Sequence, residues 1–223
     1  AAIRAKTSTT AARLQPDRRA ANELARQAEA YLTLARQLLN PPAPCLVAIG
    51  GFSASGKSTL ARSLAAHIGA APGAVVIRSD EVRKRLCGVD PLQRLGPEGY
   101  APEVSRRVYA TIADQARQVA AGGHAVIVDA VCARPADREA VARAAATAGV
   151  PMVGLWLEAA EPVLIERAAH RGPDASDADA AVIHRQFAEE TGSIPWSRVD
   201  ASKPFDTVLA AATEVLAGQC IPR

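Results

Sequence analysis

The chain has 223 residues, of which 49% are hydrophobic and 22% are charged, and its formal net charge is +3. This composition is typical of a soluble globular protein, and the length suits one domain with an appendage better than two equal domains. The basic residues are scattered, so no Lys/Arg-rich run indicates a nucleic-acid or membrane tail. No apolar run approaches the roughly 20 residues that cross a bilayer.

The four cysteines, Cys45, Cys87, Cys132 and Cys220, lie far apart and form no C-x-x-C pair. This spacing predicts free thiols in a reducing cytoplasm rather than a disulfide framework or a metal site. The single methionine is Met152, so the chain does not begin at an initiator residue. We therefore expect it to be a fragment or a processed form of a longer protein.

The first 44 residues are expected to form an appendage. Residues 1–15 are small and polar, which predicts poor order. From Pro16 to Asn40 apolar residues recur at helical spacing, and this predicts an amphipathic helix that Pro41–Pro44 ends as a stiff connector. The helix is either the end of an upstream domain or a cover for residues 45–223, which we expect to form one domain.

Strands and helices alternate along the rest of the chain. Near-continuous apolar strands separated by helices predict an α/β fold in which a parallel five-stranded sheet has helices on both faces. Ligand sites in such folds lie at the carboxyl ends of the strands. The expected strands are 45–50, 74–80, 124–131, 150–158 and 197–202, and the expected helices are 57–68, 80–87, 103–121, 135–148, 161–171, 177–190 and 205–217.

A glycine-rich loop follows the first expected strand. The sequence GFSASGKS places Gly51, Gly56, Lys57 and Ser58 at the spacing G-x-x-x-x-G-K-[ST] of the Walker A phosphate-binding loop. Backbone N–H groups and the positive end of the next helix would hold nucleotide phosphates, Lys57 would neutralise them, and the Ser58 hydroxyl would bind Mg²⁺. The assigned nucleotide contacts here are Gly51, Ser53, Ala54, Ser55, Gly56, Lys57, Ser58 and Thr59.

Two aspartates follow neighbouring strands. Asp129 ends the third strand, where a carboxylate would hold Mg²⁺ directly or through water, and no glutamate follows it to activate water as in motor ATPases. Asp80 ends the second strand, where it could take a proton from an acceptor hydroxyl, and Arg83 lies one helical turn further on. The alternatives are a helix-capping or turn aspartate at 129, a helix cap at 80 and a solvated arginine at 83.

Arg167 and Arg171 lie four residues apart and therefore share one helix face. Gly172-Pro173 ends this helix, and Ser176 with Asp179 forms a capping box that opens the next one. Two arginines beside such a break suit a lid that closes on the nucleotide and stabilises the transferring phosphate. The alternative is a pair of solvated arginines on an exposed helix.

The motifs GFSASGKST, RSDEVRKRL, VIVDAV, ERAAHRGPDASDAD and VDAS together resemble the small P-loop kinases that include gluconate kinase, zeta toxins and polynucleotide kinases. The resemblance covers residues 45–218. It is closest to the ATP-binding kinase-like domain at the carboxyl end of bacterial proteins whose amino-terminal half resembles aminoglycoside phosphotransferases. It implies a P-loop fold with a small lid, ATP and Mg²⁺ as cofactors, and an upstream phosphotransferase-like domain as partner.

The resemblance also implies roles for individual residues. Asp80 matches a general base, Arg83 an arginine that contacts the acceptor, and Arg167 and Arg171 match lid arginines. Asp200 and Ala201, in the VDAS turn, match a loop that lies against adenine. The chain lacks a basic cleft with aromatic residues that would indicate a nucleic-acid acceptor.

These observations favour a kinase that moves the γ-phosphate of ATP to a hydroxyl of a small molecule, with Lys57, Asp80, Arg83, Arg167 and Arg171 as catalytic residues. The alternatives are a nucleotide-binding module that regulates an upstream catalytic domain, and a polynucleotide 5′-hydroxyl kinase. The acceptor and the oligomeric state are left open. The absence of a guanine-reading N-K-x-D motif mildly favours ATP over GTP.

Overall fold

The computed structural model describes residues 1–170, 172 and 174–221. The chain divides into two compact units, Ala1–Pro42 and Ala43–Arg223. Among the described residues, no helix combines the length and the apolar character that crossing a membrane would need.

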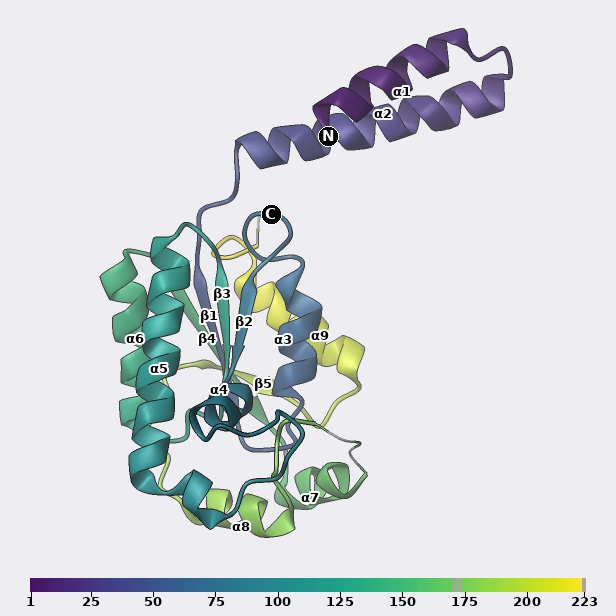
Figure 1. Cartoon of the computed structure of the whole chain (residues 1–223). Helices are drawn as coiled ribbons and strands as arrows, with labels where there is room; N and C mark the ends of the chain where they lie inside the picture. Colours follow the sequence, from purple (N-terminus) through teal and green to yellow (C-terminus); the bar gives the residue numbers. More distant parts are fainter. Residues whose placement is uncertain (171, 173, 222–223) are drawn as a thin grey trace. The chain divides into compact units, whose positions relative to one another are not determined.

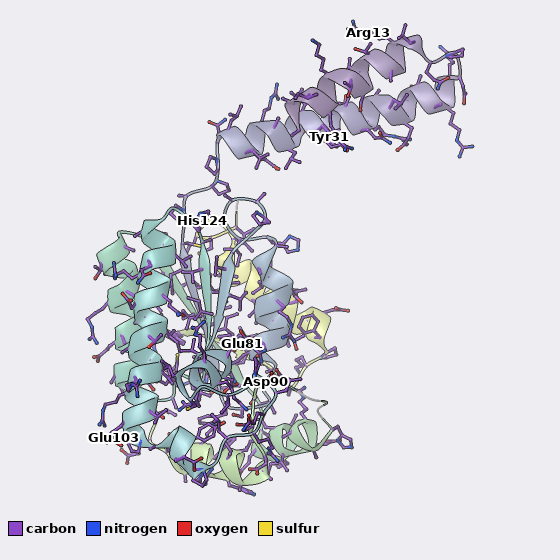
Figure 2. All side chains as sticks on the ribbon, in the orientation of Figure 1. Arg13, Tyr31, Glu81, Asp90, Glu103 and His124 are labelled. Atoms are coloured by element: carbon purple, nitrogen blue, oxygen red, sulfur yellow. The ribbon has the colours of Figure 1, made fainter. Side chains whose placement is uncertain are left out.

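The first unit is a helical hairpin. Helix α1 (Ala2–Leu14) packs along α2 (Arg18–Leu39), and Asp17 caps α2 by accepting a hydrogen bond from the N–H of Arg19. Tyr31, labelled on α2 in Figure 2, accepts a hydrogen bond from Arg4 at 3.3 Å. Residues 1–15, expected to be poorly ordered, are therefore mostly helical. The reason is that α1 packs along α2, with Ala5 of α1 and Ala28 of α2 both buried.

The second unit is built on a five-stranded sheet. Its strands are β1 (Leu46–Gly51), β2 (Val75–Arg78), β3 (Val126–Asp129), β4 (Met152–Glu158) and β5 (Ser197–Asp200). They are all parallel and lie in the order β2-β3-β1-β4-β5. The predicted fold class is therefore confirmed, and each expected strand is present within a few residues.

Helices cover both faces of this sheet (Figure 1). On one face α3 (Lys57–Ala65) and α9 (Phe205–Leu216) pack over side chains of β1, β3 and β4. On the other face lie α4 (Ser79–Leu86), α5 (Pro102–Ala121) and α6 (Pro135–Ala148). Strand β1 alternates between the two cores, with Val47 and Ile49 in one and Leu46 and Ala48 in the other, which explains its continuous apolar sequence.

Three further elements lie near the carboxyl ends of the strands. They are the 3₁₀ helix η1 (Pro97–Tyr100), α7 (Glu161–Ala169) and α8 (Ala180–Ala188). The lid segment, defined here as residues 174–179, leads into α8. The predicted capping box is wrong in one respect: Asp179, not Ser176, is the N-cap of α8, and its carboxylate accepts a hydrogen bond from the N–H of Val182 at 3.0 Å.

Candidate active site

A cavity of about 1260 Å³ opens at the carboxyl ends of the strands. Its walls come from the glycine loop, α4, the 88–103 loop, the segment after β3, and α8 with the lid segment. In Figure 2, Glu81 on α4 lies beside this end of the sheet. The cavity brings together most of the residues that the sequence assigned to catalysis, nucleotide and metal: Ser53, Ala54, Gly56, Lys57, Ser58, Thr59, Asp80, Arg83, Asp129 and Arg167.

The glycine loop needs its glycines for two different reasons. At Gly51, with φ of +127°, an added Cβ would lie 2.4 Å from the carbonyl oxygen of Leu157, so both the backbone angle and the space exclude a side chain. At Gly56, with φ of +92°, a Cβ would meet nothing within 4 Å, so the backbone angle alone favours glycine. Ala54 also has a positive φ, of 63°. Together these angles turn the loop over the start of α3.

The start of α3 presents a site for an anion. Gly56 is the N-cap of this helix, and the first helical hydrogen bond runs from Leu60 N–H to the Gly56 carbonyl. The N–H groups of Lys57, Ser58 and Thr59 therefore have no acceptor within the helix, and they share the positive end of its dipole. Lys57 is 9% exposed, and its ammonium donates to the Phe52 carbonyl at 2.8 Å. These residues fit the phosphates of a nucleotide.

Asp129 closes the other side of the phosphate region. Its side chain is 4% exposed, and Arg78, at the end of β2, brings Nε to within 3.4 Å of the Asp129 carboxylate. The same guanidinium donates to Asp174 at 2.8 and 3.1 Å and to Glu81 at 3.0 Å. Burial alone lowers the pKa of Arg78, but the hydrogen bond and charge of Asp174, followed by Asp129 and Glu81, raise it overall. Asp129 is thus a structured ion-pair partner rather than an isolated turn residue.

The side chains present fit a magnesium ion. Ser58 and Asp129 both line the cavity and would supply a hydroxyl and a carboxylate oxygen, which Mg²⁺ accepts as ligands. Among the described residues, no group of three or more His, Cys, Asp or Glu side chains could hold a metal alone. This suits an ion that completes its coordination with phosphate oxygens and water.

Asp80 is in the first turn of α4 and is not its N-cap, a position that Arg78 occupies. Burial is the largest cause of a raised pKa at the Asp80 carboxyl, and the charge of Asp129 raises it further. Lys57, Arg78 and Arg83 act in the opposite direction. The carboxyl therefore lies close enough to Lys57 for their charges to interact, and it binds a proton more readily than an exposed aspartate.

Arg83 is buried rather than solvated, with 8% of its surface exposed. Its guanidinium donates to the Gly99 carbonyl at 2.7 Å and to the Ser105 hydroxyl at 3.3 Å, and it lies 4.8 Å from the centre of the Tyr100 ring. All three partners belong to the 88–103 loop or the start of α5. Arg83 is thus held against the 88–103 loop, which forms one wall of the cavity, and the solvated alternative is excluded.

The predicted adenine contacts are only partly assembled. Arg167 lines the cavity and donates to the Ala201 carbonyl at 2.8 Å, so α7 is tied to the turn after β5. Asp200 instead lines a separate pocket with Trp156 and Ile194, and its carboxylate accepts from the N–H of Ser202 at 2.9 Å. Arg171 lies outside the described residues. Of the glycine-loop residues, Gly51 and Ser55 do not line the main cavity.

Asp177 fastens the lid segment to α4 and to the 88–103 loop. This carboxylate accepts from the Lys84 ammonium at 2.8 Å, from the Leu95 N–H at 2.9 Å and from the Tyr100 hydroxyl at 2.8 Å. Burial and the bond to Asp177 raise the pKa of Tyr100. The three contacts hold the lid segment against α4 and the 88–103 loop, which both line the cavity.

Sequence reasoning missed several residues that line the cavity or contact its walls: Arg78, Lys84, Tyr100, Asp174, Asp177 and also Gln186, which lines the cavity from α8. A signal existed for Arg78, since an arginine that directly follows an apolar strand lies at the carboxyl edge of the sheet. No local signal marks Lys84 or Asp177, because their positions 93 residues apart in the chain become neighbours only through the fold.

Comparison with known proteins agrees with this geometry. The family model described as "AAA domain" matches residues 46–190. An uncharacterized protein of Mycobacterium tuberculosis is 30% identical over 197 residues, which are 86% of this chain and 39% of that protein. The chain thus spans about two fifths of the length of that relative. The adenylyl-sulfate kinase of Myxococcus xanthus is 32% identical over 173 residues, 74% of this chain and 85% of that enzyme.

Solved structures share the fold at lower identity. A gluconokinase from Sinorhizobium meliloti superposes with TM-score 0.53 and 21% identity. The match includes 78% of this chain and 91% of the gluconokinase chain. An APS kinase from Mycobacterium tuberculosis, solved in complex with AMPPNP and APS, superposes with TM-score 0.57 and 19% identity. The match includes 78% of this chain and 98% of the APS kinase chain. The chain therefore belongs to the AAA domain family, as a P-loop kinase-like member related to adenylyl-sulfate kinase.

Proposed function

We propose that this chain is an ATP- and Mg²⁺-dependent kinase that transfers the γ-phosphate of ATP to a hydroxyl group of a small molecule. One observation carries the proposal: Asp80, Lys57 and Asp129 line one cavity, and their charges act on one another. A water-activating base in place of Ala130 would have favoured hydrolysis instead. The related adenylyl-sulfate kinase and gluconokinase support a small hydroxyl acceptor in general.

Each residue has a part in the proposed mechanism. The N–H groups at the start of α3 and the Lys57 ammonium would bind the phosphates and offset the charge that develops during transfer. Asp80 would accept the proton of the acceptor hydroxyl while that oxygen bonds to the γ-phosphorus and the bond to the ADP oxygen breaks. A magnesium ion held by Ser58 and Asp129 would supply further charge neutralisation.

The neighbouring groups would orient the reactants. Arg83 and the 88–103 loop would hold the acceptor, and Arg167 and the turn at Ala201 would hold the nucleoside end. Asp177 would keep the lid segment on the acceptor loop and exclude water, which otherwise competes as the acceptor.

The test is ADP formation by the full chain with Mg²⁺ATP and a panel of acceptors. The panel contains adenylyl sulfate, gluconate and other sugar acids, sugars, aminoglycosides, nucleosides and 5′-hydroxyl oligonucleotides, and Lys57→Ala is the blank. A Lys57-dependent increase with one acceptor class establishes a kinase and names its substrate class. Tight nucleotide binding with no acceptor above the water rate would instead support the regulatory module. A response confined to the oligonucleotides would support a polynucleotide kinase.

Two further assignments are proposals of the same kind. We place the protein in the cytoplasm, because all four cysteines are free thiols and such thiols suit a reducing compartment. We also propose an upstream phosphotransferase-like domain in the full-length protein, a partner consistent with relatives of which this chain spans 39%. Sequencing the complete gene product tests the second assignment directly.

A further inference from the structure

One peptide group of the glycine loop is held from both sides. The peptide between Phe52 and Ser53 has a carbonyl oxygen that accepts from the Lys57 ammonium at 2.8 Å. Its N–H donates to the side-chain oxygen Oε1 of Gln186 on α8, also at 2.8 Å. Because a peptide group is planar, these two bonds together fix the direction in which both polar atoms point.

Gln186 makes a second bond to the same loop. Its Nε2 donates to the Ser53 hydroxyl at 3.0 Å, so the carboxamide contacts Ser53 through both of its polar atoms. The orientation of the carboxamide is determined by this pairing, since the Ser53 N–H can only donate and requires the oxygen. Ser53 is 8% exposed, so an unpaired N–H there would be costly.

The neighbouring side chain of α8 strengthens the same contact. The Phe187 ring lies 4.7 Å from the Phe52 ring, centre to centre, and Phe52 in turn lies 5.8 Å from Trp156. Gln186 and Phe187, which are consecutive in α8, therefore contact Ser53 and Phe52, which are consecutive in the glycine loop. The lid segment that precedes α8 is tied elsewhere, to Arg78 through Asp174 and to Lys84 through Asp177.

From this arrangement we infer that Gln186 is a positioning residue for phosphoryl transfer, acting through the Phe52–Ser53 peptide on the Lys57 ammonium. The inference rests on the proposed function only for its kinetic consequence. Gln186 lines the same cavity as Lys57 and Asp80, yet it needs no contact with a reactant to act. When the lid segment and α8 are in place, the bond to Gln186 fixes the glycine loop in one geometry. Without the bond to Gln186, only the Lys57 bond to the Phe52 carbonyl restrains this peptide.

Gln186→Ala removes both bonds, whereas Gln186→Glu keeps an acceptor for the Ser53 N–H and adds a negative charge beside the phosphate site. The matched control is His184→Ala, also on α8, which removes a 2.6 Å bond to Glu161 of α7 and leaves the glycine loop untouched. The first measurement is amide hydrogen exchange in the full chain, on peptides covering residues 50–58. Gln186→Ala is expected to speed this exchange about fivefold, with Gln186→Glu and His184→Ala close to the wild type.

The second measurement is turnover, with the acceptor found above or with water. Gln186→Ala is expected to lower kcat about tenfold while KM for ATP changes less than about threefold, because positioning acts mainly on the transfer step. Gln186→Glu is expected to raise KM for ATP by repelling the phosphates. Equal amide exchange over residues 50–58 in Gln186→Ala and His184→Ala would overturn the inference. Faster exchange in Gln186→Ala with an unchanged kcat would overturn it as well. If no acceptor raises ADP formation by the wild type, only the proposed function is contradicted. Amide hydrogen exchange and the rate of phosphoryl transfer to water still test the role of Gln186.

Discussion

The Lys84 ammonium and the Asp177 carboxylate form a buried ion pair of 2.8 Å between α4 and the lid segment, with side chains 1% and 8% exposed. Asp177 also accepts hydrogen bonds from Leu95 and Tyr100, and Lys84 donates to the Gln93 carbonyl. The free-energy cost of desolvating two charges is offset here by several further hydrogen bonds to the Lys84 ammonium and the Asp177 carboxylate. The pair joins the lid segment to α4 and to the 88–103 loop, whose contacting residues lie 77 to 93 positions earlier in the chain.

Removing one partner of this pair is expected to be more harmful than removing both. Asp177→Leu would leave the Lys84 ammonium buried without its carboxylate, at a cost of about 3 kcal/mol or more of unfolding free energy. Lys84→Met combined with Asp177→Leu is expected to recover part of that loss, because no uncompensated charge remains. Urea denaturation of both single variants and the double variant measures the coupling. Additive losses would show that the two residues do not act as a pair.

The same carboxylate predicts a pH dependence. Burial by itself raises the pKa of Asp177, but hydrogen bonds from Lys84, Leu95 and Tyr100 lower it below its ordinary value of 3.8 overall. The ionised form is therefore favoured by folding, and its contribution is complete above about pH 3.8 and lost as the pH falls further. Denaturation midpoints of the wild type and Asp177→Asn should converge on acidification. A constant difference across that range would contradict this account.

Asp80→Asn is expected to separate stability from activity. The pKa of Asp80 is higher in the folded protein than in the unfolded chain. Ionising this carboxyl therefore opposes folding, and the free energy of unfolding falls as the pH rises from the unfolded-state pKa to the folded-state pKa. Asparagine removes that charge, so the variant should melt higher at pH 7 while losing phosphoryl transfer and keeping ATP affinity. Calorimetry and nucleotide titration test the two halves. A variant that loses ATP binding along with transfer would remove Asp80 from the role of base.

The two loop glycines should respond differently to alanine. Gly51→Ala would place a Cβ 2.4 Å from the Leu157 carbonyl oxygen, so the loop must shift, and ATP affinity is expected to be lost together with several kcal/mol of stability. Gly56→Ala meets open space and carries only the strain of its positive φ, about 1 to 2 kcal/mol. Thermal unfolding and ATP titration of the two variants give the comparison. Equal effects would show that space at Gly51 is not limiting.

Arg138 is expected to be a structural residue that lysine cannot replace. Its guanidinium is 4% exposed and donates to four carbonyl oxygens, those of Cys132, Ala133, Thr191 and Ser193. A lysine ammonium is a single point and cannot span the two segments. Both Arg138→Lys and Arg138→Ala should therefore lower the unfolding free energy by about 3 kcal/mol or more. Full stability in Arg138→Lys would contradict this reasoning.

The sequence predicted the sheet and the glycine loop well because their signals are local. Apolar strands, helix periodicity and the spacing from Gly51 to Ser58 are all read within short windows. The start of α8 was misplaced because Ser176 and Asp179 are both acceptable caps, and only the structure shows which one accepts the bond from Val182. Order in residues 1–15 was missed because a weakly amphipathic helix depends on a partner helix rather than on its own sequence.

The parts of the site that could not be predicted are long-range contacts of ordinary residues. Gln186 reaches Ser53 across 133 positions, and Asp174 reaches Arg78 across 96. A glutamine on a helix or an aspartate in a loop carries no distinguishing pattern, so only tertiary structure reveals its partner. Asp80, by contrast, lies within a few residues of the end of an apolar strand, so a local pattern predicted its place at the carboxyl edge of the sheet, where it lines the cavity.

The connection through Asp177 has a consequence for engineering specificity. The 88–103 loop forms a wall of the cavity and is proposed to hold the acceptor, but its backbone and Tyr100 are fastened to Asp177, a residue that follows α7. Grafting this loop from another kinase would therefore fail if the donor and host differ at Asp177 or Lys84. We therefore expect that a change of substrate by loop exchange would need the 88–103 loop and the lid segment to be replaced together.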